Sequence, residues 1–173
     1  MQKKIIFITG GARSGKSAFA EGLAAKADGR RAYVATAQAL DAEMVARVEQ
    51  HRKRRGDAWD TYEEPLAVAE LLRKLEGRCG LLLLDCLTLW LSNVMARQEN
   101  DETVLSQCDD LVAALRTFPG TCIVVSNEVG LGIVPDNPLA RRFRDLAGII
   151  NQRMAKAADE AYFIAAGMPV RMK

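Results

Sequence analysis

The sequence predicts an α/β domain with a mostly parallel sheet flanked by helices. Short apolar runs alternate with longer segments of helical periodicity, which is typical of consecutive strand–helix units. The first apolar run leads into the glycine-rich stretch GGARSGKS, which opens a helical segment, as at a nucleotide-binding turn. The chain has 173 residues without an internal repeat, low-complexity segment or linker, so residues 1–173 are expected to form one domain.

The expected strands are the short apolar runs. Residues 81–84 are four consecutive leucines, the pattern of a strand that is buried on both faces, and Asp85 follows them directly. The other expected strands are residues 5–9, 32–36, 121–126, 162–166 and 170–172. Because helical segments separate most of these runs, most of the strands should be parallel.

The expected helices are recognised from their periodicity and from their ends. Asp41 is suited to cap a helix that starts beside it, and Pro65 suits the first position of the next helix, which Gly77 ends. The buried stripe of that second helix is Val68, Leu71, Leu72 and Leu75. The remaining expected helices are residues 16–27, 87–97, 102–118 and 139–158.

The stretch GGARSGKS fits the pattern G-x-x-x-x-G-K-[ST], in the strand–turn–helix context that phosphate binding requires. Its glycines allow backbone N–H groups and the helix N-terminus to face phosphate oxygens. Lys16 is predicted to bridge the β- and γ-phosphates, and Ser17 to hold Mg²⁺. The sequence therefore predicts that a nucleoside triphosphate binds to Gly10, Gly11, Ala12, Arg13, Ser14, Gly15, Lys16 and Ser17.

Asp85 stands at the end of a buried strand, where P-loop proteins place a second magnesium-coordinating acid. Ser17 and Asp85 are therefore the predicted Mg²⁺ ligands. The alternative is that Asp85 caps the helix that follows it. The two interpretations differ in the metal dependence that they predict.

His51 is the only histidine of the chain, and it lies on the helix expected from Asp41, on the same face as two apolar residues. One interpretation is a solvated helix end, where the helix dipole favours a histidine. The other is a nucleophile, because a neutral imidazole nitrogen can attack phosphorus and nearby arginines lower the histidine pKa. The basic run that follows the histidine is Arg52, Lys53, Arg54 and Arg55.

Composition argues against several classes of protein. The formal net charge of +2 and the aromatic content of 6% give no support for a nucleic-acid-binding surface, so nucleic acid is not an expected partner. No apolar stretch reaches membrane-spanning length, and the apolar run near the start is too short for a signal peptide. The four cysteines show neither CxxC spacing nor the density of a disulfide scaffold. We therefore expect a reduced, cytoplasmic protein.

Several segments together resemble one enzyme family. They are ITGGARSGKSAFAE, YVATAQALDAEMVARVEQHRKRR, the acid after LLLL, and NEVGLGIVPDNPLARRFRDLAGIINQRMAKAADEAYFIAAGMPVRMK. They are similar to the bifunctional adenosylcobinamide kinase / adenosylcobinamide-phosphate guanylyltransferases of cobalamin biosynthesis, from about residue 4 to the C-terminus. The patterns A-T-x-x-x-x-D-x-E-M and N-E-V-G-x-G-I-V-P are more specific than the phosphate loop. The match is weakest at residues 97–118, where only a helical pattern is shared.

The resemblance implies two successive reactions. ATP or GTP phosphorylates the hydroxyl of the aminopropanol arm of adenosylcobinamide, and GTP then transfers GMP to that phosphate, giving adenosylcobinamide-GDP and pyrophosphate. The family carries GMP on a histidine, to which His51 corresponds. The resemblance also implies a RecA-like P-loop fold and a homotrimer.

The resemblance further implies which residues bind the nucleotide. Besides the phosphate loop, they are Ala35, Thr36, Ala37, Arg52, Lys53, Arg54, Arg55, Glu63 and Asp85. Glu63 also has a plainer interpretation as a surface acid beside Glu64. Two alternative functions stay open: a P-loop kinase in which His51 is structural, and a RecA-like ATPase module that uses hydrolysis for switching.

The loop NEVGLGIVPDNP follows the strand expected at residues 121–126. Its glycines and prolines are suited to shape a long connection. Loops at the carboxyl ends of parallel strands also bind ligands in α/β proteins, so we expect Asn127 and Glu128 to contact nucleotide or corrinoid. Arg141, Arg142 and Arg144 on the next helix are expected to be solvated rather than to form an oligomer interface.

Overall fold

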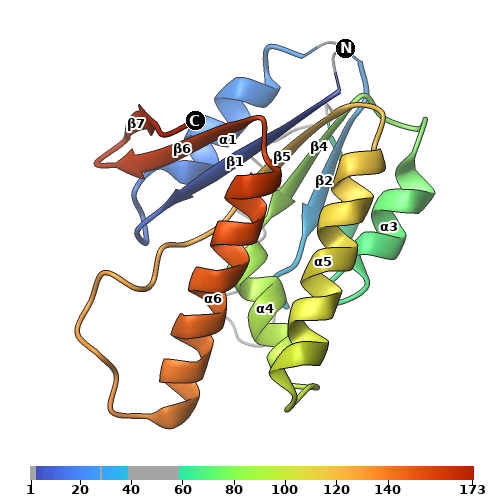
Figure 1. Cartoon of the computed structure of the whole chain (residues 1–173). Coiled ribbons are helices and arrows are strands. Elements are labelled where there is room, and N and C mark those ends of the chain that lie inside the picture. Colours follow the sequence, from blue (N-terminus) through green and yellow to red (C-terminus); the bar gives the residue numbers. More distant parts are fainter. Residues whose placement is uncertain (1–2, 28, 39–58) are drawn as a thin grey trace.

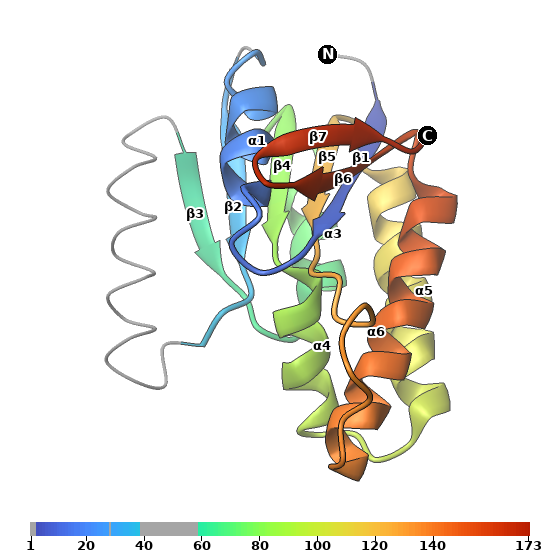
Figure 2. The ribbon, with the colours of Figure 1, turned by 90° about the vertical axis from the view of Figure 1, so that its left-hand side faces the viewer.

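A computed structural model describes residues 3–27, 29–38 and 59–173. These residues form a seven-stranded sheet in the order β3-β2-β4-β5-β1-β6-β7, with helices on both faces (Figures 1 and 2). The strands are β1 (Lys4–Gly10), β2 (Arg31–Ala35), β3 (Trp59–Glu63), β4 (Leu81–Asp85), β5 (Thr121–Val125), β6 (Glu160–Ala165) and β7 (Met168–Arg171). The helices are α1 (Lys16–Ala24), α3 (Val68–Leu75), α4 (Leu87–Met95), α5 (Asp101–Thr117) and α6 (Pro138–Ala157).

All neighbouring strands are parallel except β7, which pairs antiparallel with β6. The predicted fold class, an α/β protein with a mostly parallel sheet flanked by helices, is confirmed. Strand β5 lies between β1 and β4, although β4 precedes β5 in the chain. The strand that leads into the phosphate loop and the strand that ends in Asp85 are therefore separated by one strand.

The two faces of the sheet bury alternate residues of each strand. On β1, Ile5 and Phe7 pack in the same core as helices α3 to α6, whereas Ile6 and Ile8 pack in the core that includes Ala20 of α1. Figure 2 shows α1 on the opposite side of the sheet from α5 and α6. Because the central strands are covered on both faces, their residues are mostly apolar, which is why the sequence revealed these strands.

Strand β3 was not predicted. Its sequence WDTYE alternates polar and aromatic residues, and none of its side chains is fully buried. Pairing with β2 alone places it at the edge of the described sheet, where an apolar run is not required. The helix expected from Asp41, with His51 on it, lies outside the described residues.

The prediction that Pro65 starts a helix was wrong, because α3 begins at Val68. The carboxylate of Glu64 accepts hydrogen bonds from the backbone N–H groups of Leu66 and Ala67, at 3.0 and 2.8 Å. These bonds hold residues 65–67 in a bend that precedes the helix. Leu71 is partly buried and packs against the core rather than within it.

The expectation that the arginines at the start of α6 are merely solvated was wrong for two of them. Arg141 donates to the carbonyl oxygens of Pro135 and Asp136, at 2.9 and 2.7 Å, and so holds the preceding loop. Arg142 donates to the carboxylate of Asp101 and to two carbonyls of the α4–α5 connection. Within the described part of the chain, Arg144 pairs locally, with its neighbour Asp145.

In the described part of the chain, no helix has the length and apolar character needed to cross a membrane.

Candidate nucleotide-binding site

The carboxyl ends of the parallel strands bring together predicted residues from distant parts of the chain. Ala35 ends β2 and is paired in register with Glu63 at the end of β3 and with Asp85 at the end of β4. Gly10 ends β1 at the same edge of the sheet, and the phosphate loop follows it. This edge is where an open α/β sheet binds its ligand.

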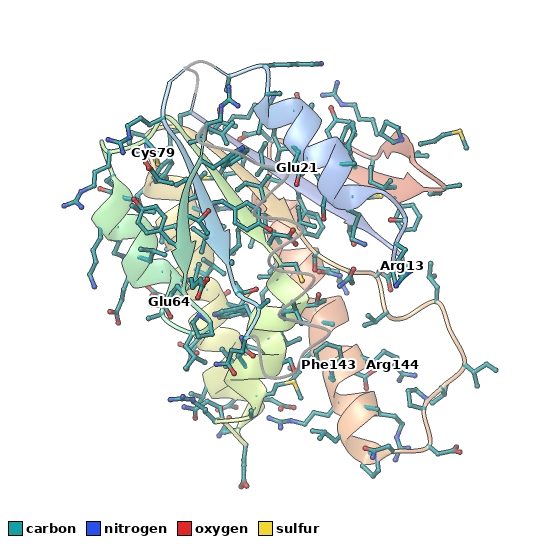
Figure 3. All side chains as sticks on the ribbon, turned by 180° about the vertical axis from the view of Figure 1, so that it is seen from behind. Arg13, Glu21, Glu64, Cys79, Phe143 and Arg144 are labelled. Atoms are coloured by element: carbon teal, nitrogen blue, oxygen red, sulfur yellow. The ribbon has the colours of Figure 1, made fainter. Side chains whose placement is uncertain are left out.

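The phosphate loop, residues 10–17, links β1 to α1. Gly10 and Gly15 have positive φ angles of 151° and 101°, which other residues rarely adopt. Arg13 also has a positive φ, 56°, and its exposed side chain points outward from the loop (Figure 3). The backbone conformation at these residues explains why the loop is rich in glycine.

Lys16 is buried at the start of α1, and its Nζ donates to the carbonyl oxygen of Gly11 at 2.6 Å. Burial lowers the pKa of Lys16, while the nearby Cys86 and Asp85 act in the opposite direction. A buried ammonium group is stabilised by an anionic partner, and phosphate oxygens are such partners. The position of Lys16 therefore suits the predicted role in phosphate binding.

Asp85 accepts hydrogen bonds from two hydroxyl groups on other elements. Ser17 Oγ donates to Asp85 Oδ2 at 3.3 Å, and the Tyr33 hydroxyl donates to the same oxygen at 2.9 Å. The N-cap of α4 is Cys86, without a side-chain cap, so the alternative that Asp85 caps this helix is wrong. The sequence did not single out Tyr33, because its contact with Asp85 depends on β2 and β4 being neighbours.

The oxygen atoms of Ser17 and Asp85 fit the chemistry of Mg²⁺, which prefers hard oxygen ligands and is bound by one or two protein groups together with substrate phosphates. Groups of three or more histidine, cysteine or acidic side chains suited to hold a metal are absent from the described residues.

The segment Ala35–Ala37 offers the site its backbone more than its side chains. Thr36 is fully buried, donates to the carbonyl of Cys86 at 2.8 Å and accepts from the N–H of Cys86 at 2.9 Å. Ala35 is buried and Ala37 is half-buried. Thr36 thus ties the end of β2 to the residue after Asp85.

Glu63 and Glu64 are neighbours in sequence but have different surroundings in the structure. Glu63 is exposed at the end of β3, beside Ala35 and on the edge that carries the phosphate loop. Glu64 uses its carboxylate in the bend before α3, and Figure 3 shows it beside that helix. Of the two acids, Glu64 is the one that the bend before α3 uses.

The loop after β5 is anchored to the site by its first residues. Asn127 donates to Thr88 Oγ1 at 2.9 Å, and the backbone N–H of Glu128 donates to the carbonyl of Gly10 at 3.0 Å. The Glu128 carboxylate accepts from the N–H of Gly130 at 2.6 Å. Asn127 therefore ties the start of this loop to α4, and Glu128 ties it to the phosphate loop. Beyond them the loop extends outward (Figure 1) and exposes Leu131 and Ile133.

His51 and the basic residues Arg52, Lys53, Arg54 and Arg55 lie outside the described residues. Their predicted roles are therefore taken up below as proposals.

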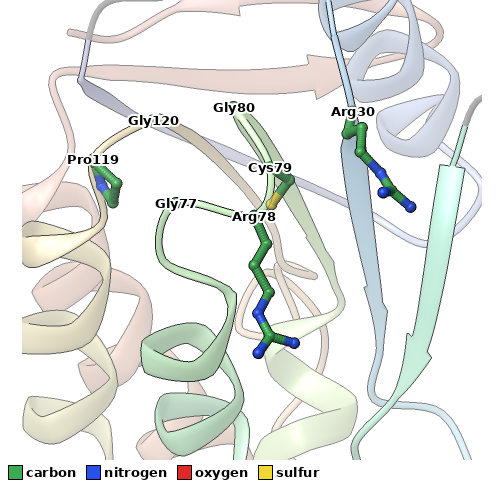
Figure 4. Close-up of a pocket in the computed structure, with 7 residues that line it drawn as sticks. All are labelled: Arg30, Gly77, Arg78, Cys79, Gly80, Pro119 and Gly120. Atoms are coloured by element: carbon green, nitrogen blue, oxygen red, sulfur yellow. The ribbon is translucent and has the colours of Figure 1, made fainter.

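A cavity of about 370 Å³ lies at the opposite, amino end of the sheet (Figure 4). It is lined by Arg30, Gly77, Arg78, Cys79, Gly80, Pro119 and Gly120. Arg30 is already paired with Asp60 through two hydrogen bonds. The cavity has no part of the phosphate loop in its wall, so it is not the nucleotide site.

The sheet order, the phosphate loop and the Ser17–Asp85 contact define a protein of the P-loop NTPase class with a RecA-like fold. A KaiC-like protein from Pyrococcus horikoshii shares this fold, with a TM-score of 0.55 and 15% identity, over 94% of this chain and 71% of that chain. Residues 6–172 match the family described as cobinamide kinase / cobinamide phosphate guanyltransferase. The chain belongs to this enzyme family, which confirms the resemblance seen in the sequence.

Two relatives are similar in sequence to this chain over nearly its full length. The bifunctional adenosylcobalamin biosynthesis protein CobP of Pseudomonas aeruginosa is 46% identical, over 96% of this chain and 95% of the relative. The bifunctional adenosylcobalamin biosynthesis protein CobU of Escherichia coli is 38% identical, over 98% of this chain and 99% of the relative.

Proposed function

We propose that the protein phosphorylates adenosylcobinamide with ATP or GTP, and then transfers GMP from GTP to the product through a covalent adduct on His51. Adenosylcobinamide-GDP and pyrophosphate are the final products. Family membership supports the two activities. The observation that carries the proposal is the phosphate loop joined to Asp85 through Ser17, at the strand ends where Ala35 and Glu63 also lie.

In the first reaction, the aminopropanol hydroxyl oxygen attacks the γ-phosphorus of the donor. The bond from this phosphorus to the β,γ-bridging oxygen breaks, the nucleoside diphosphate leaves, and the hydroxyl proton passes to water or a base. Catalysis of this step depends chiefly on positioning and on charge stabilisation. Lys16 supplies positive charge beside the transferred group, and the N–H groups of the phosphate loop orient it.

In the second reaction, a neutral His51 nitrogen attacks the α-phosphorus of GTP. A P–N bond forms, the bond to the β-phosphate oxygen breaks, and pyrophosphate leaves. A phosphate oxygen of adenosylcobinamide phosphate then attacks the same phosphorus, and the P–N bond breaks to regenerate the histidine. The basic run Arg52 to Arg55 is proposed to neutralise the phosphates during both steps.

Ser17 and Asp85 are proposed to hold Mg²⁺ together with phosphate oxygens. The ion would neutralise charge on the β- and γ-phosphates. Gly10 to Ser17, Ala35 to Ala37, Glu63 and Asp85 are proposed to line the nucleotide site as one group.

The test is the intact mass of the purified protein after incubation with GTP and Mg²⁺, beside a His51→Ala variant. We expect an acid-labile adduct of the mass of GMP on the wild type alone, because a phosphoramidate hydrolyses in acid. Absence of the adduct while nucleotide still binds would leave a kinase without guanylyl transfer and would contradict the proposed role of His51. Stimulation of nucleotide turnover by single-stranded DNA would instead favour an ATPase module.

We also propose that the protein is a cytoplasmic homotrimer. Buried free thiols at all four cysteines fit a reducing compartment. The exposed apolar side chains Leu131, Ile133 and Leu139 offer surface that an oligomer would cover. Sedimentation equilibrium of the purified protein should give three times the chain mass, and a monomer mass would contradict the trimer.

A further inference from the structure

The turn between β6 and β7 lies against the phosphate loop. Strand β6 runs parallel to β1, with Gly10 in register with Ile164, and the chain then reverses so that Ala165 pairs with Met168. Figure 2 shows β6 and β7 beside β1, where they form one edge of the sheet. A C-terminal turn that is remote in sequence is thus a neighbour of the loop that follows β1.

Three contacts join the turn and the strand before it to the loop. The backbone N–H of Gly167 donates to the carbonyl oxygen of Ser14 at 2.8 Å. A β-carbon on Gly15 would lie 3.1 Å from the Cα of Gly167, and one on Gly10 would lie 2.4 Å from the carbonyl oxygen of Ile164. This packing therefore requires glycine at positions 10 and 15, apart from any requirement of phosphate binding.

We infer that Gly167 is a positioning residue, which aims a backbone N–H of the phosphate loop at the bound phosphates. The carbonyl of Ser14 and the N–H of Gly15 belong to one planar, trans peptide unit and point in opposite directions. Because Gly167 holds this carbonyl on the outer side of the loop, the N–H of Gly15 is directed to the inner side. This inference rests on the part of the proposed function in which the loop binds a triphosphate, and it is independent of the second substrate.

A second backbone contact works in the same way and supports the inference. The N–H of Glu128 donates to the carbonyl of Gly10 at 3.0 Å, which turns the N–H of Gly11 away from Glu128. The loop is thus held from outside at two of its peptide units, by Glu128 near its start and by Gly167 near its end. Preorganised N–H groups bind anions without the cost of reorienting them.

The backbone of the turn explains why glycine occupies position 167. The φ angles of Ala166 and Gly167 are 50° and 80°, so both central residues of this two-residue turn are left-handed. A β-carbon on Gly167 would have no neighbouring atom within 4 Å. Substitution by alanine therefore disturbs the backbone of the turn without a steric clash.

The test compares Gly167→Ala with a matched variant, Gly77→Ala. Gly77 also has a positive φ, 73°, and a β-carbon there would likewise have no atom within 4 Å. It lies at the opposite end of the sheet, in the wall of the cavity of Figure 4. Both variants should lower the melting temperature by roughly 2–4 °C, because the backbone strain is similar.

The probe is inorganic tripolyphosphate with Mg²⁺, titrated calorimetrically into the full chain. Gly167→Ala should weaken binding by about tenfold, the effect of losing one well-aimed hydrogen bond to a charged group, whereas Gly77→Ala should bind as the wild type does. Gly167→Asn should restore most of the affinity, because asparagine tolerates left-handed φ better than alanine. If the two alanine variants bind tripolyphosphate with the same affinity, either both unchanged or both equally weakened, the inference is overturned.

Hydrogen exchange of the wild type provides a second measurement that needs no substitution. The Gly167 amide should exchange more slowly once tripolyphosphate is bound, because the ligand and the turn then restrain the same peptide units. An unchanged exchange rate at Gly167 under saturating tripolyphosphate would contradict the inference. Neither measurement uses adenosylcobinamide or guanylyl transfer, so failure of the proposed reactions and failure of this inference give different results.

Discussion

Asp85 accepts hydrogen bonds on one carboxylate oxygen from Ser17 on α1 and from Tyr33 on β2. Tyr33 is 5% exposed and packs edge-to-face on Trp59, with ring centroids 6.1 Å apart. Its hydroxyl is therefore fixed by the core, and it fixes the carboxylate in turn. Groups that orient a metal ligand in this way affect metal affinity even though they do not touch the metal.

We predict that Tyr33→Phe raises the Mg²⁺ concentration needed for half-maximal nucleotide binding by roughly tenfold. The ring and its packing are kept, so only the hydroxyl bond to Asp85 is lost. Calorimetric titration of Mg²⁺ into the protein with nucleotide present measures the shift. Tyr62→Phe on β3 is the control, because Tyr62 packs against the other face of the sheet. A similar shift in both variants would show that the effect is general and not due to Asp85.

We predict that Lys16→Ala lowers the rate constant of the kinase reaction by roughly 10²–10³-fold, as when a preorganised charge-stabilising donor is removed elsewhere. Lys16 is buried beside the loop carbonyl of Gly11, where a phosphate oxygen is expected. Lys26→Ala is the control, since Lys26 is exposed beyond the end of α1. Steady-state kinetics of adenosylcobinamide phosphorylation measures both, and a nearly normal rate in Lys16→Ala would contradict the assignment of the phosphate loop.

At the scale of residues, the sequence predicted contacts that are contiguous or follow a strand directly. Gly10 to Ser17 form one uninterrupted motif, and Asp85 ends a run of leucines. Tyr33 and Gly167 were missed, because nothing in their local sequence marks them and their contacts depend on which strands are neighbours. The expectation that Asn127 and Glu128 contact a ligand stays a prediction, and the structure adds a supporting role for both.

At the scale of elements, helix α6 is attached at its start by side-chain contacts and by a cap. Arg142 is joined to Asp101 at 2.7 Å and to the carbonyls of Gln98 and Glu99 at 3.1 and 2.8 Å, so it links α6 to the connection between α4 and α5. The side chain of Asn137 caps the helix by accepting from the N–H groups of Leu139 and Ala140, and Pro138 occupies its first turn. The loop before α6 is thereby held at its end as well as at its start.

We predict that Arg142→Ala lowers the free energy of unfolding by about 1–2 kcal/mol, since one carboxylate and two carbonyls lose their donor. Arg144→Ala should cost less than about 0.5 kcal/mol, because the partner of Arg144 among the described residues is its exposed neighbour Asp145. Urea denaturation of the two variants compares arginines on the same helix. Equal losses would mean that the link to the α4–α5 connection adds nothing to stability.

At the scale of elements, sequence reading was accurate for the buried strands and the capped helices. The predicted bounds of β1, β4 and β5 differ from the observed ones by about one residue, because each strand is an apolar run limited by polar or glycine residues. The sequence did not reveal β3, because its alternating polar and aromatic residues form no apolar run. The predicted start of α3 at Pro65 is three residues before the observed start at Val68. There the Glu64 carboxylate holds the chain in a bend that proline alone did not reveal.

At the scale of the whole molecule, two hydrophobic cores lie on opposite faces of the sheet. All four cysteine thiols are buried in these cores. Sequence predicted the sheet and its flanking helices, since strands covered on both faces must be apolar. The order of the strands was not predicted, because register and neighbours depend on contacts across the chain. That order places Asp85 within reach of Ser17, so the completed site is a property of the assembled sheet.

Burial of the thiols also predicts how stability depends on pH. Burial raises the pKa of the Cys108 thiol to about 12, from an ordinary value of 9.0. Below pH 9 the thiol is protonated in both the folded and the unfolded chain, and it adds no pH dependence. Between pH 9 and 12 only the unfolded chain loses the proton, so the free energy of unfolding falls as the pH rises.

We therefore predict that the free energy of unfolding of the wild type falls by roughly 1 kcal/mol more between pH 8 and pH 10 than that of Cys108→Ala. The variant is less stable at both pH values because it leaves a small cavity in the core where the Cys108 side chain packs. This loss of stability is independent of pH. Urea denaturation under reducing conditions at the two pH values gives the difference, in which the titration of lysines and tyrosines common to both chains cancels. Parallel pH dependence of the two chains would show that the Cys108 thiol ionises as readily in the folded protein as in the unfolded one.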